Sequence, residues 1–116
     1  MTPMQRSLSV LRGLGYVAWR VEHWNAFAKI RQDLFGFADI LAIRVGSKHL
    51  LVQTCAASDG AKRRAKILAN EHALTWLQTG GEISLHRWAK RGGRGEKKSW
   101  DWGNEYITEE QFTDKV

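Results

Sequence analysis

The spacing of apolar residues predicts an α-helix at the beginning of the chain and β-strands after it. Residues 4–13 carry apolar side chains at the spacing of one helical face. Residues 16–22 are rich in β-branched and aromatic side chains, and the runs 37–45 and 48–56 are mostly apolar, so we expect three strands there. The segment 24–32 between the first two strands is interpreted as a polar, basic connection.

In the second half of the chain the pattern changes first to a helical period and then back to strands. A broad apolar stripe over residues 59–79 predicts one long helix. Alternating side chains in 82–88 predict a fourth strand, and 100–107 predicts a last edge strand, paired with the fourth across a glycine-rich basic loop. Thr108 and Gln111 form a capping-box pattern for a short terminal helix.

This order of elements predicts an α/β fold. The three early strands can form an antiparallel meander, because their connections are short, and the long helix must cross over to bring the fourth strand back into the sheet. At 116 residues with 43% hydrophobic side chains, the chain can bury one ordinary core. We therefore expect a single domain over residues 1–116.

The chain is basic, and its charge is unevenly distributed. The formal net charge is +6, and basic side chains crowd into residues 87–98. Such a cluster indicates a polyanionic partner, although a solvated loop explains the segment equally well when it is taken alone. The single cysteine excludes an internal disulfide and a cysteine-rich zinc site. Because no apolar run has membrane-spanning length and no signal-peptide pattern occurs, we expect a cytoplasmic protein with no membrane partner.

Polar residues interrupt the apolar second and third strands. Asp39 lies near the start of the second strand, and Gln53-Thr54-Cys55 lies within the third. A carboxylate on an apolar strand face is costly to desolvate, so a cation or a hydrogen-bond network should compensate Asp39. These positions are therefore the first candidates for chemistry.

The hairpin between these two strands decides whether the polar residues can meet. Asp39, Gln53 and Cys55 share one face of the sheet only when the loop contains an odd number of residues, because side chains alternate between faces. A tight two-residue turn would instead place Thr54 opposite Asp39.

The order of elements and the polar residues resemble the PD-(D/E)xK nucleases, and within them small phage proteins related to Holliday junction resolvases and VRR-NUC domains. The resemblance rests on the strands DLFGFADILAI and LLVQTCA and on the basic helix after them. In that family an Asp opens the second strand and an acidic-x-Lys triplet lies on the third. Asp39 matches the Asp, Gln53 stands at the acidic position and Cys55 at the lysine position. The resemblance implies a restriction-endonuclease-like αβββαβ core with a mixed sheet flanked by helices.

Phosphodiester cleavage by such a protein would use a divalent cation, for which we expect Mg²⁺ or Mn²⁺. Magnesium prefers oxygen ligands, above all carboxylates. The resemblance implies Asp39, the Gln53 amide oxygen and the Thr54 carbonyl as ligands, with Glu22 and Asp33 as candidates for a further carboxylate.

Cys55 departs from the family pattern, because a thiol cannot act as the ammonium group that holds the scissile phosphate. Lys62 or Lys66 can supply this cation from the first turns of the long helix. The candidate catalytic residues are therefore Asp39, Gln53, Cys55 and Lys62.

Basic residues in two segments are candidates for nucleic-acid contacts. Those near the N-terminal end of the long helix oppose the helix macrodipole, so they indicate either a phosphate-binding site or a solvated polar stripe. Those of the glycine-rich loop would contact the DNA backbone without reading its sequence. The candidates are Lys62, Arg63, Arg64, Lys66, Arg87, Lys90, Arg91, Arg94, Lys97 and Lys98.

The leading hypothesis is a metal-dependent DNA endonuclease of phage or mobile-element type. Selection of branched DNA is implied by the resemblance alone. The alternative hypothesis is a catalytically inactive protein of the same fold that binds nucleic acid or an acidic protein partner, since Gln53 and Cys55 alter two motif positions. Because relatives that cut two strands commonly form dimers, a homodimer is a further expectation.

Overall fold

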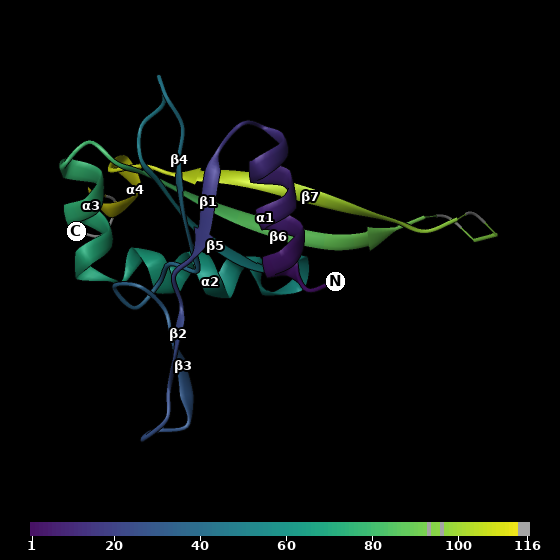
Figure 1. Ribbon diagram of the computed structural model, residues 1–116, viewed down its shortest axis with the longest axis horizontal. Coiled ribbons are helices and arrows are strands. Elements are labelled where there is room, and N and C mark those ends of the chain that lie inside the picture. Colours follow the sequence, from purple (N-terminus) through teal and green to yellow (C-terminus); the bar gives the residue numbers. More distant parts are fainter. Residues whose placement is uncertain (93, 96, 114–116) are drawn as a thin grey trace.

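The computed structural model describes residues 1–113 apart from 93 and 96, and it contains a mixed β-sheet with helices on both faces (Figure 1). In chain order the elements are α1 (Pro3–Gly13), β1 (Val17–Arg20), β2 (His23–Asn25), β3 (Ile30–Gln32), β4 (Ile40–Ile43), β5 (Leu50–Ala56), the 3₁₀ turn η1 (Ala57–Asp59), α2 (Gly60–Leu68), α3 (Glu71–Gln78), β6 (Glu82–Arg91), β7 (Ser99–Ile107) and α4 (Glu110–Thr113).

The main sheet has five strands in the order β1-β4-β5-β6-β7. β1, β4 and β5 pair antiparallel, β5 and β6 pair parallel, and β6 and β7 pair antiparallel. The predicted meander and the crossover into a fourth strand are therefore confirmed, as is an α/β fold with a mixed sheet flanked by helices. β5 is the central strand, and its side chains are buried from Leu50 to Cys55 because both sheet faces are covered.

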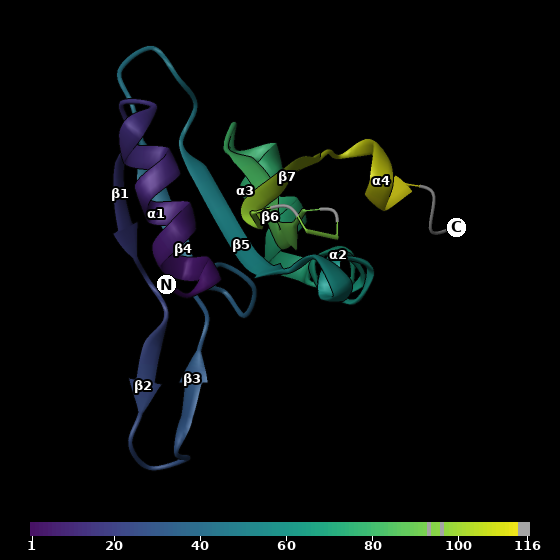
Figure 2. The ribbon, with the colours of Figure 1, turned by 90° about the vertical axis from the view of Figure 1, so that its right-hand side faces the viewer.

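Two hydrophobic clusters lie on opposite faces of this sheet. Leu11 of α1 belongs to a cluster with Val52 of β5, whereas Ile67 of α2 belongs to a cluster with Leu51 of β5. Neighbouring β5 residues enter different clusters because successive strand side chains point to opposite faces. Figure 2 shows α1 on one side of β5, and α2 and α3 on the other. In the described part of the chain, the helices are too short or too polar to cross a membrane.

The prediction of one long helix over residues 59–79 was wrong, because Asn70 divides this segment into α2 and α3. Asn70 has extended backbone geometry, and its side-chain oxygen accepts hydrogen bonds from the backbone N–H groups of His72 and Ala73 at 2.8 and 3.2 Å. Its side-chain amide also donates to the Phe35 carbonyl at 2.9 Å. An Asn that caps a new helix and fixes a distant loop favours two short helices over one continuous helix.

The predicted polar connection over residues 24–32 is a second, two-stranded sheet. β2 and β3 pair antiparallel from His23 opposite Gln32 to Asn25 opposite Ile30. We call residues 23–32 the β2–β3 arm, because this hairpin projects away from the main sheet (Figure 2). Sequence patterns missed its strands because the arm has no buried face, so its side chains do not alternate between apolar and polar.

The predicted fourth and last strands are both present and form a long ribbon. β6 pairs with β7 from Ile83 opposite Ile107 out to Arg91 opposite Ser99. Beyond the pair of Trp88 and Trp102, this hairpin extends past β5 and the rest of the sheet (Figure 1). We call this far end the β6–β7 ribbon, and it carries Lys90, Arg91, Arg94, Lys97 and Lys98.

A buried polar network joins α1 to β6. Ser7 is fully buried, its hydroxyl oxygen lies 2.9 Å from His86 Nδ1, and it accepts a hydrogen bond from Trp88 Nε1 at 2.8 Å. Burial lowers the pKa of His86 to about 4, so this imidazole is neutral at physiological pH. One hydroxyl therefore satisfies two buried ring nitrogens and fixes α1 on the sheet.

We expect the Ser7→Ala variant to lose about 2 to 4 kcal/mol of unfolding free energy, because it leaves two buried ring nitrogens without a partner. Urea denaturation measures this loss. The matched control is Ser9→Ala, an exposed position on the same helix, which should change stability by less than about 0.5 kcal/mol. Equal stabilities of the two variants would contradict this assignment.

Candidate functional site

The register of the β4–β5 hairpin places Asp39 opposite Gln53. Ile40 pairs with Val52, and the Asp39 backbone N–H donates to the Val52 carbonyl at 2.8 Å. The last pair is Ala42 opposite Leu50, so an odd number of residues, 43–49, lies between the paired positions. This odd number places Asp39 and Gln53 on the same face of the sheet. The hairpin therefore does not have the two-residue turn that would have separated them.

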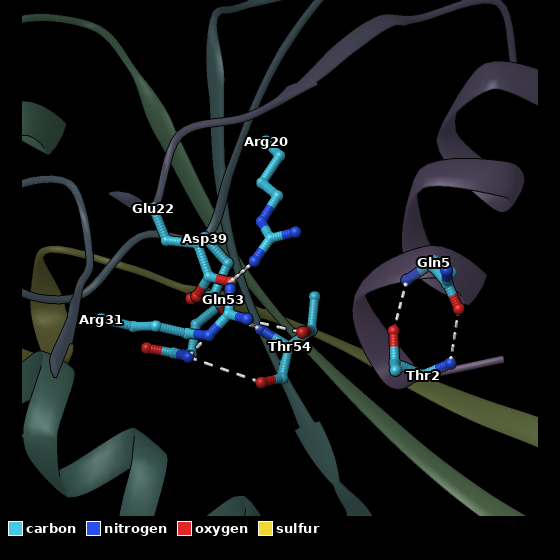
Figure 3. Close-up of polar contacts among 8 residues, drawn as sticks. All are labelled: Thr2, Gln5, Arg20, Glu22, Arg31, Asp39, Gln53 and Thr54. Atoms are coloured by element: carbon cyan, nitrogen blue, oxygen red, sulfur yellow. Dashed lines mark hydrogen bonds and ion pairs between the residues drawn. The ribbon is translucent and has the colours of Figure 1, made fainter. Parts of the chain in front are cut away.

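The Asp39 carboxylate is held by the strand that it faces (Figure 3). Its Oδ2 accepts hydrogen bonds from Gln53 Nε2 at 2.8 Å, from the Thr54 backbone N–H at 2.9 Å and from the Thr54 hydroxyl at 3.4 Å. Asp39 is only 5% exposed. The compensation that a desolvated carboxylate requires thus comes from a hydrogen-bond network on β5.

Two further carboxylates lie beside Asp39. Glu22 immediately precedes β2, and Asp33 immediately follows β3, so the two strands of the arm bring them together. One carboxylate oxygen from each of Glu22, Asp33 and Asp39 lies within 4.8 Å of the others. We call these three residues the acidic cluster. The further carboxylates predicted from the sequence, Glu22 and Asp33, therefore lie where a shared cation would need them.

Basic side chains pair with the outer two members of the acidic cluster. Glu22 Oε1 lies 2.7 Å from a guanidinium nitrogen of Arg20 and 3.3 Å from one of Arg31. Lys66 Nζ lies 3.2 Å from Asp33 Oδ2. In the described part of the chain, no ion pair reaches Asp39 itself. The innermost carboxylate is thus held by neutral donors, and the cations stay at the rim.

The pKa of Asp39 is raised from 3.8 to about 7. Burial is the largest cause, and the nearby charges of Asp33 and Glu22 add to it, while the hydrogen bond from the Thr54 backbone opposes it. A bound cation would reverse this balance, because it would favour the ionised carboxylate.

Gln53 contributes a buried side-chain oxygen to the site. The residue is 2% exposed, and its Nε2 donates to Asp39 and, at 3.4 Å, to the Thr54 carbonyl. Its Oε1 is buried and accepts no hydrogen bond from any residue that the structure describes. An unsatisfied buried acceptor costs about 1 to 3 kcal/mol, so a ligand that used this oxygen would recover that cost.

These groups line one pocket of about 340 Å³. Its lining includes the acidic cluster, Gln53, Thr54 and Cys55, together with the start of α1 and residues of η1 and α2. The volume falls within the usual range for ligand pockets. The three motif positions predicted from the sequence therefore share one concave site.

Arg63, rather than Lys62, is the α2 cation that lines this pocket. Lys62 is exposed and is not part of the lining, whereas Arg63 lines the pocket. The Nε of Arg63 is buried and has no hydrogen-bond partner among the described residues. Burial raises the pKa of the Cys55 thiol, and the charge of Arg63 opposes that rise. The thiol is thus a neutral lining group, and Arg63 is the cation near the family's lysine position.

The other predicted nucleic-acid contacts divide into paired and exposed residues. Arg64 makes two hydrogen bonds to Glu105, Arg87 also lies near that carboxylate, and Arg91 pairs with Asp101 at 3.1 Å. These three arginines already have acidic partners. On the β6–β7 ribbon, Lys90, Arg94, Lys97 and Lys98 are exposed and have no acidic partner among the described residues.

Comparison with known proteins gives no relative from which a function could be carried over. No protein-family model matches the chain, and no curated protein or solved structure matches it.

The raised pKa of Asp39 predicts a pH-dependent stability. Its contribution to folding is complete below pH 3.8 and is lost as the pH rises through about 7, because the unfolded chain ionises this carboxyl first. In metal-free buffer, we expect wild type to lose roughly 2 to 3 kcal/mol relative to Asp39→Asn between pH 5 and pH 8. Urea denaturation of both proteins across this range measures the difference, and a difference that does not vary with pH would contradict the raised pKa.

Proposed function

We propose that this protein is a metal-dependent DNA endonuclease with a restriction-endonuclease-like core. The observation that carries the proposal is the acidic cluster beside the unpartnered Gln53 oxygen, in a pocket that also presents Arg63. Three carboxylates brought close together in a partly desolvated site favour a cation, and the donors are all oxygens.

The donor set fits Mg²⁺ or Mn²⁺. Asp39, Glu22 and Asp33 would supply carboxylate oxygens, and Gln53 Oε1 would supply the neutral one. Such an ion neutralises charge on a phosphodiester and lowers the pKa of an attacking water. The Thr54 N–H and the Gln53 amide hold the Asp39 carboxylate in place before any ion arrives.

Arg63 would hold the scissile phosphate. Its side chain lines the pocket, and a guanidinium binds phosphate oxygens through several parallel hydrogen bonds. An arginine remains charged at any physiological pH, so it can bind and orient the phosphate but cannot remove a proton from water. This role replaces the lysine of the family pattern by a residue from the following helix.

DNA would be held mainly through its backbone. The net charge is +6, and Lys90, Arg94, Lys97 and Lys98 extend from the domain on the β6–β7 ribbon. Phosphate contacts of this kind supply affinity without sequence information. Preference for branched DNA and a phage or mobile-element origin belong to the same proposal and follow from the resemblance of the motif.

A second candidate function is nucleic-acid or acidic-protein binding without cleavage. It is favoured by the basic partners of Glu22 and Asp33, which already neutralise part of the acidic cluster, and by the thiol at Cys55. In this case the carboxylates would form a structural ion-pair network and take no metal.

Asp39→Asn separates the two functions. With Mn²⁺ or Mg²⁺ and linear, flapped or four-way DNA, we expect wild type to cleave and Asp39→Asn to lose about a hundredfold or more of that activity, because a direct metal ligand is removed. Asp59→Asn is the matched control, since Asp59 lines the same pocket outside the acidic cluster. Salt-sensitive DNA binding by wild type without metal-dependent cleavage would support the second function.

Arg63→Gln tests the phosphate contact. We expect it to reduce cleavage by about tenfold to a hundredfold while Mn²⁺ binding, measured by calorimetry, is retained, because only the phosphate loses its partner. Lys62→Gln removes the same charge from the neighbouring exposed position and should leave cleavage within about threefold of wild type. A larger loss from Lys62→Gln than from Arg63→Gln would show that the cation assignment is wrong.

A further inference from the structure

The β2–β3 arm exposes an unusual concentration of large apolar side chains. Phe27, at its tip, is 102% exposed, Trp24 is 58% exposed and Ile30 is 50% exposed. Burying one such side chain is worth about 1.5 to 3 kcal/mol, so an arm that keeps three of them in water is expected to gain from a partner.

The tip is held in a defined shape. The Asn25 side-chain oxygen accepts hydrogen bonds from the backbone N–H groups of Phe27 and Ala28 at 3.0 and 3.1 Å, and Lys29 adopts a positive φ of 55°. The turn therefore presents Phe27 at the end of a fixed hairpin, which reduces the ordering cost of binding.

The charge of the arm favours a polyanion as the partner. Residues 23–32 contain Lys29 and Arg31 and no acidic side chain. Trp24 pairs directly with Arg31 across the two strands, but Arg31 already pairs with Glu22 at 3.3 Å. Lys29, in the turn beside Phe27, is the cation of the arm that has no acidic partner among the described residues. Aromatic rings next to cations are the groups that stack on bases and neutralise the adjoining phosphates.

The arm is joined directly to the acidic cluster. Glu22 and Asp33 are the residues that enter and leave it, so the same two strands position the carboxylates and the aromatic tip. Three residue steps of extended chain lead from Glu22 to Asn25, which corresponds to about 10 Å, and Phe27 lies in the turn just beyond them. The tip of the arm therefore lies within about five nucleotide steps of the acidic cluster along one strand of a duplex.

We propose that the β2–β3 arm stacks Phe27 and Trp24 on unpaired bases within about five nucleotides of the phosphate in the pocket. The proposal rests on the proposed function in taking nucleic acid as the substrate, and it adds the feature of that substrate which the arm recognises. Paired bases are already stacked on their neighbours, so only unpaired or easily unstacked bases offer their faces to these rings at low cost.

The test measures DNA binding without divalent metal, so that it does not depend on cleavage. The probes are a blunt duplex and the same duplex with a single-stranded tail that carries 2-aminopurine at one of its first five positions. We expect wild type to change the 2-aminopurine fluorescence and to prefer the tailed probe, and Phe27→Ala and Trp24→Ala each to lose about tenfold of that preference.

Val45→Ala is the matched control. Val45 is 103% exposed in the loop between β4 and β5, so this substitution removes an exposed apolar side chain from another hairpin. It should leave the preference unchanged. Equal effects of Phe27→Ala and Val45→Ala would overturn the proposal. A second result would also overturn it: Phe27→Ala converts a dimer to a monomer in sedimentation but keeps the preference for the tailed probe. The arm would then bind a second copy of this chain.

The outcomes separate the arm from the pocket. Cleavage that depends on Asp39 but shows no effect of Phe27→Ala on DNA preference would leave the proposed function standing and reject the role of the arm. Base stacking that depends on Phe27, in a protein that never cleaves, would support the arm and reject the endonuclease.

Discussion

The hydrogen bonds between Asp39 and β5 are the interaction on which the candidate site depends. They form only because Ile40 pairs with Val52, which brings the carboxylate opposite Gln53 and next to the Thr54 N–H. Burial would otherwise make this charge too costly to place in the sheet. Once Asp39 is fixed, its carboxylate lies close to those of Glu22 and Asp33. Because like charges repel at short range, this cluster favours a bound positive ion.

The two hairpins that leave the sheet give the site its surroundings. The β6–β7 ribbon is an extension of two core strands and carries exposed lysines and an arginine, whereas the β2–β3 arm carries aromatic side chains and is attached at the acidic cluster. One extension therefore concentrates positive charge, and the other concentrates exposed aromatic rings. Because both are built from paired strands, they hold their directions relative to the pocket better than unstructured loops of the same length would.

Sequence patterns predicted the elements whose burial is regular and failed where it is not. The meander and the crossover follow from alternating or continuous apolar runs, whereas the parity of the hairpin was left open by the sequence and is decided by the pairing of Ile40 with Val52. The break at Asn70 was hidden because the apolar stripe continues across the cap. The side chains of adjacent residues such as Lys62 and Arg63 point in directions about 100° apart around the helix axis. An error of one residue in the assumed orientation of α2 therefore selects the exposed Lys62 in place of Arg63 at the pocket. The arm was missed because its large side chains face water.

The central claim is that the acidic cluster and the Gln53 oxygen together bind a divalent cation. A crystal structure of the protein grown or soaked with Mn²⁺, with the ion located by its anomalous scattering, tests this claim most directly. We expect an anomalous peak within about 2.0 to 2.3 Å of oxygens from Asp39 and at least one of Glu22 and Asp33. Mn²⁺ bound elsewhere, with Arg20, Arg31 and Lys66 still paired to the carboxylates and no peak among them, would contradict it.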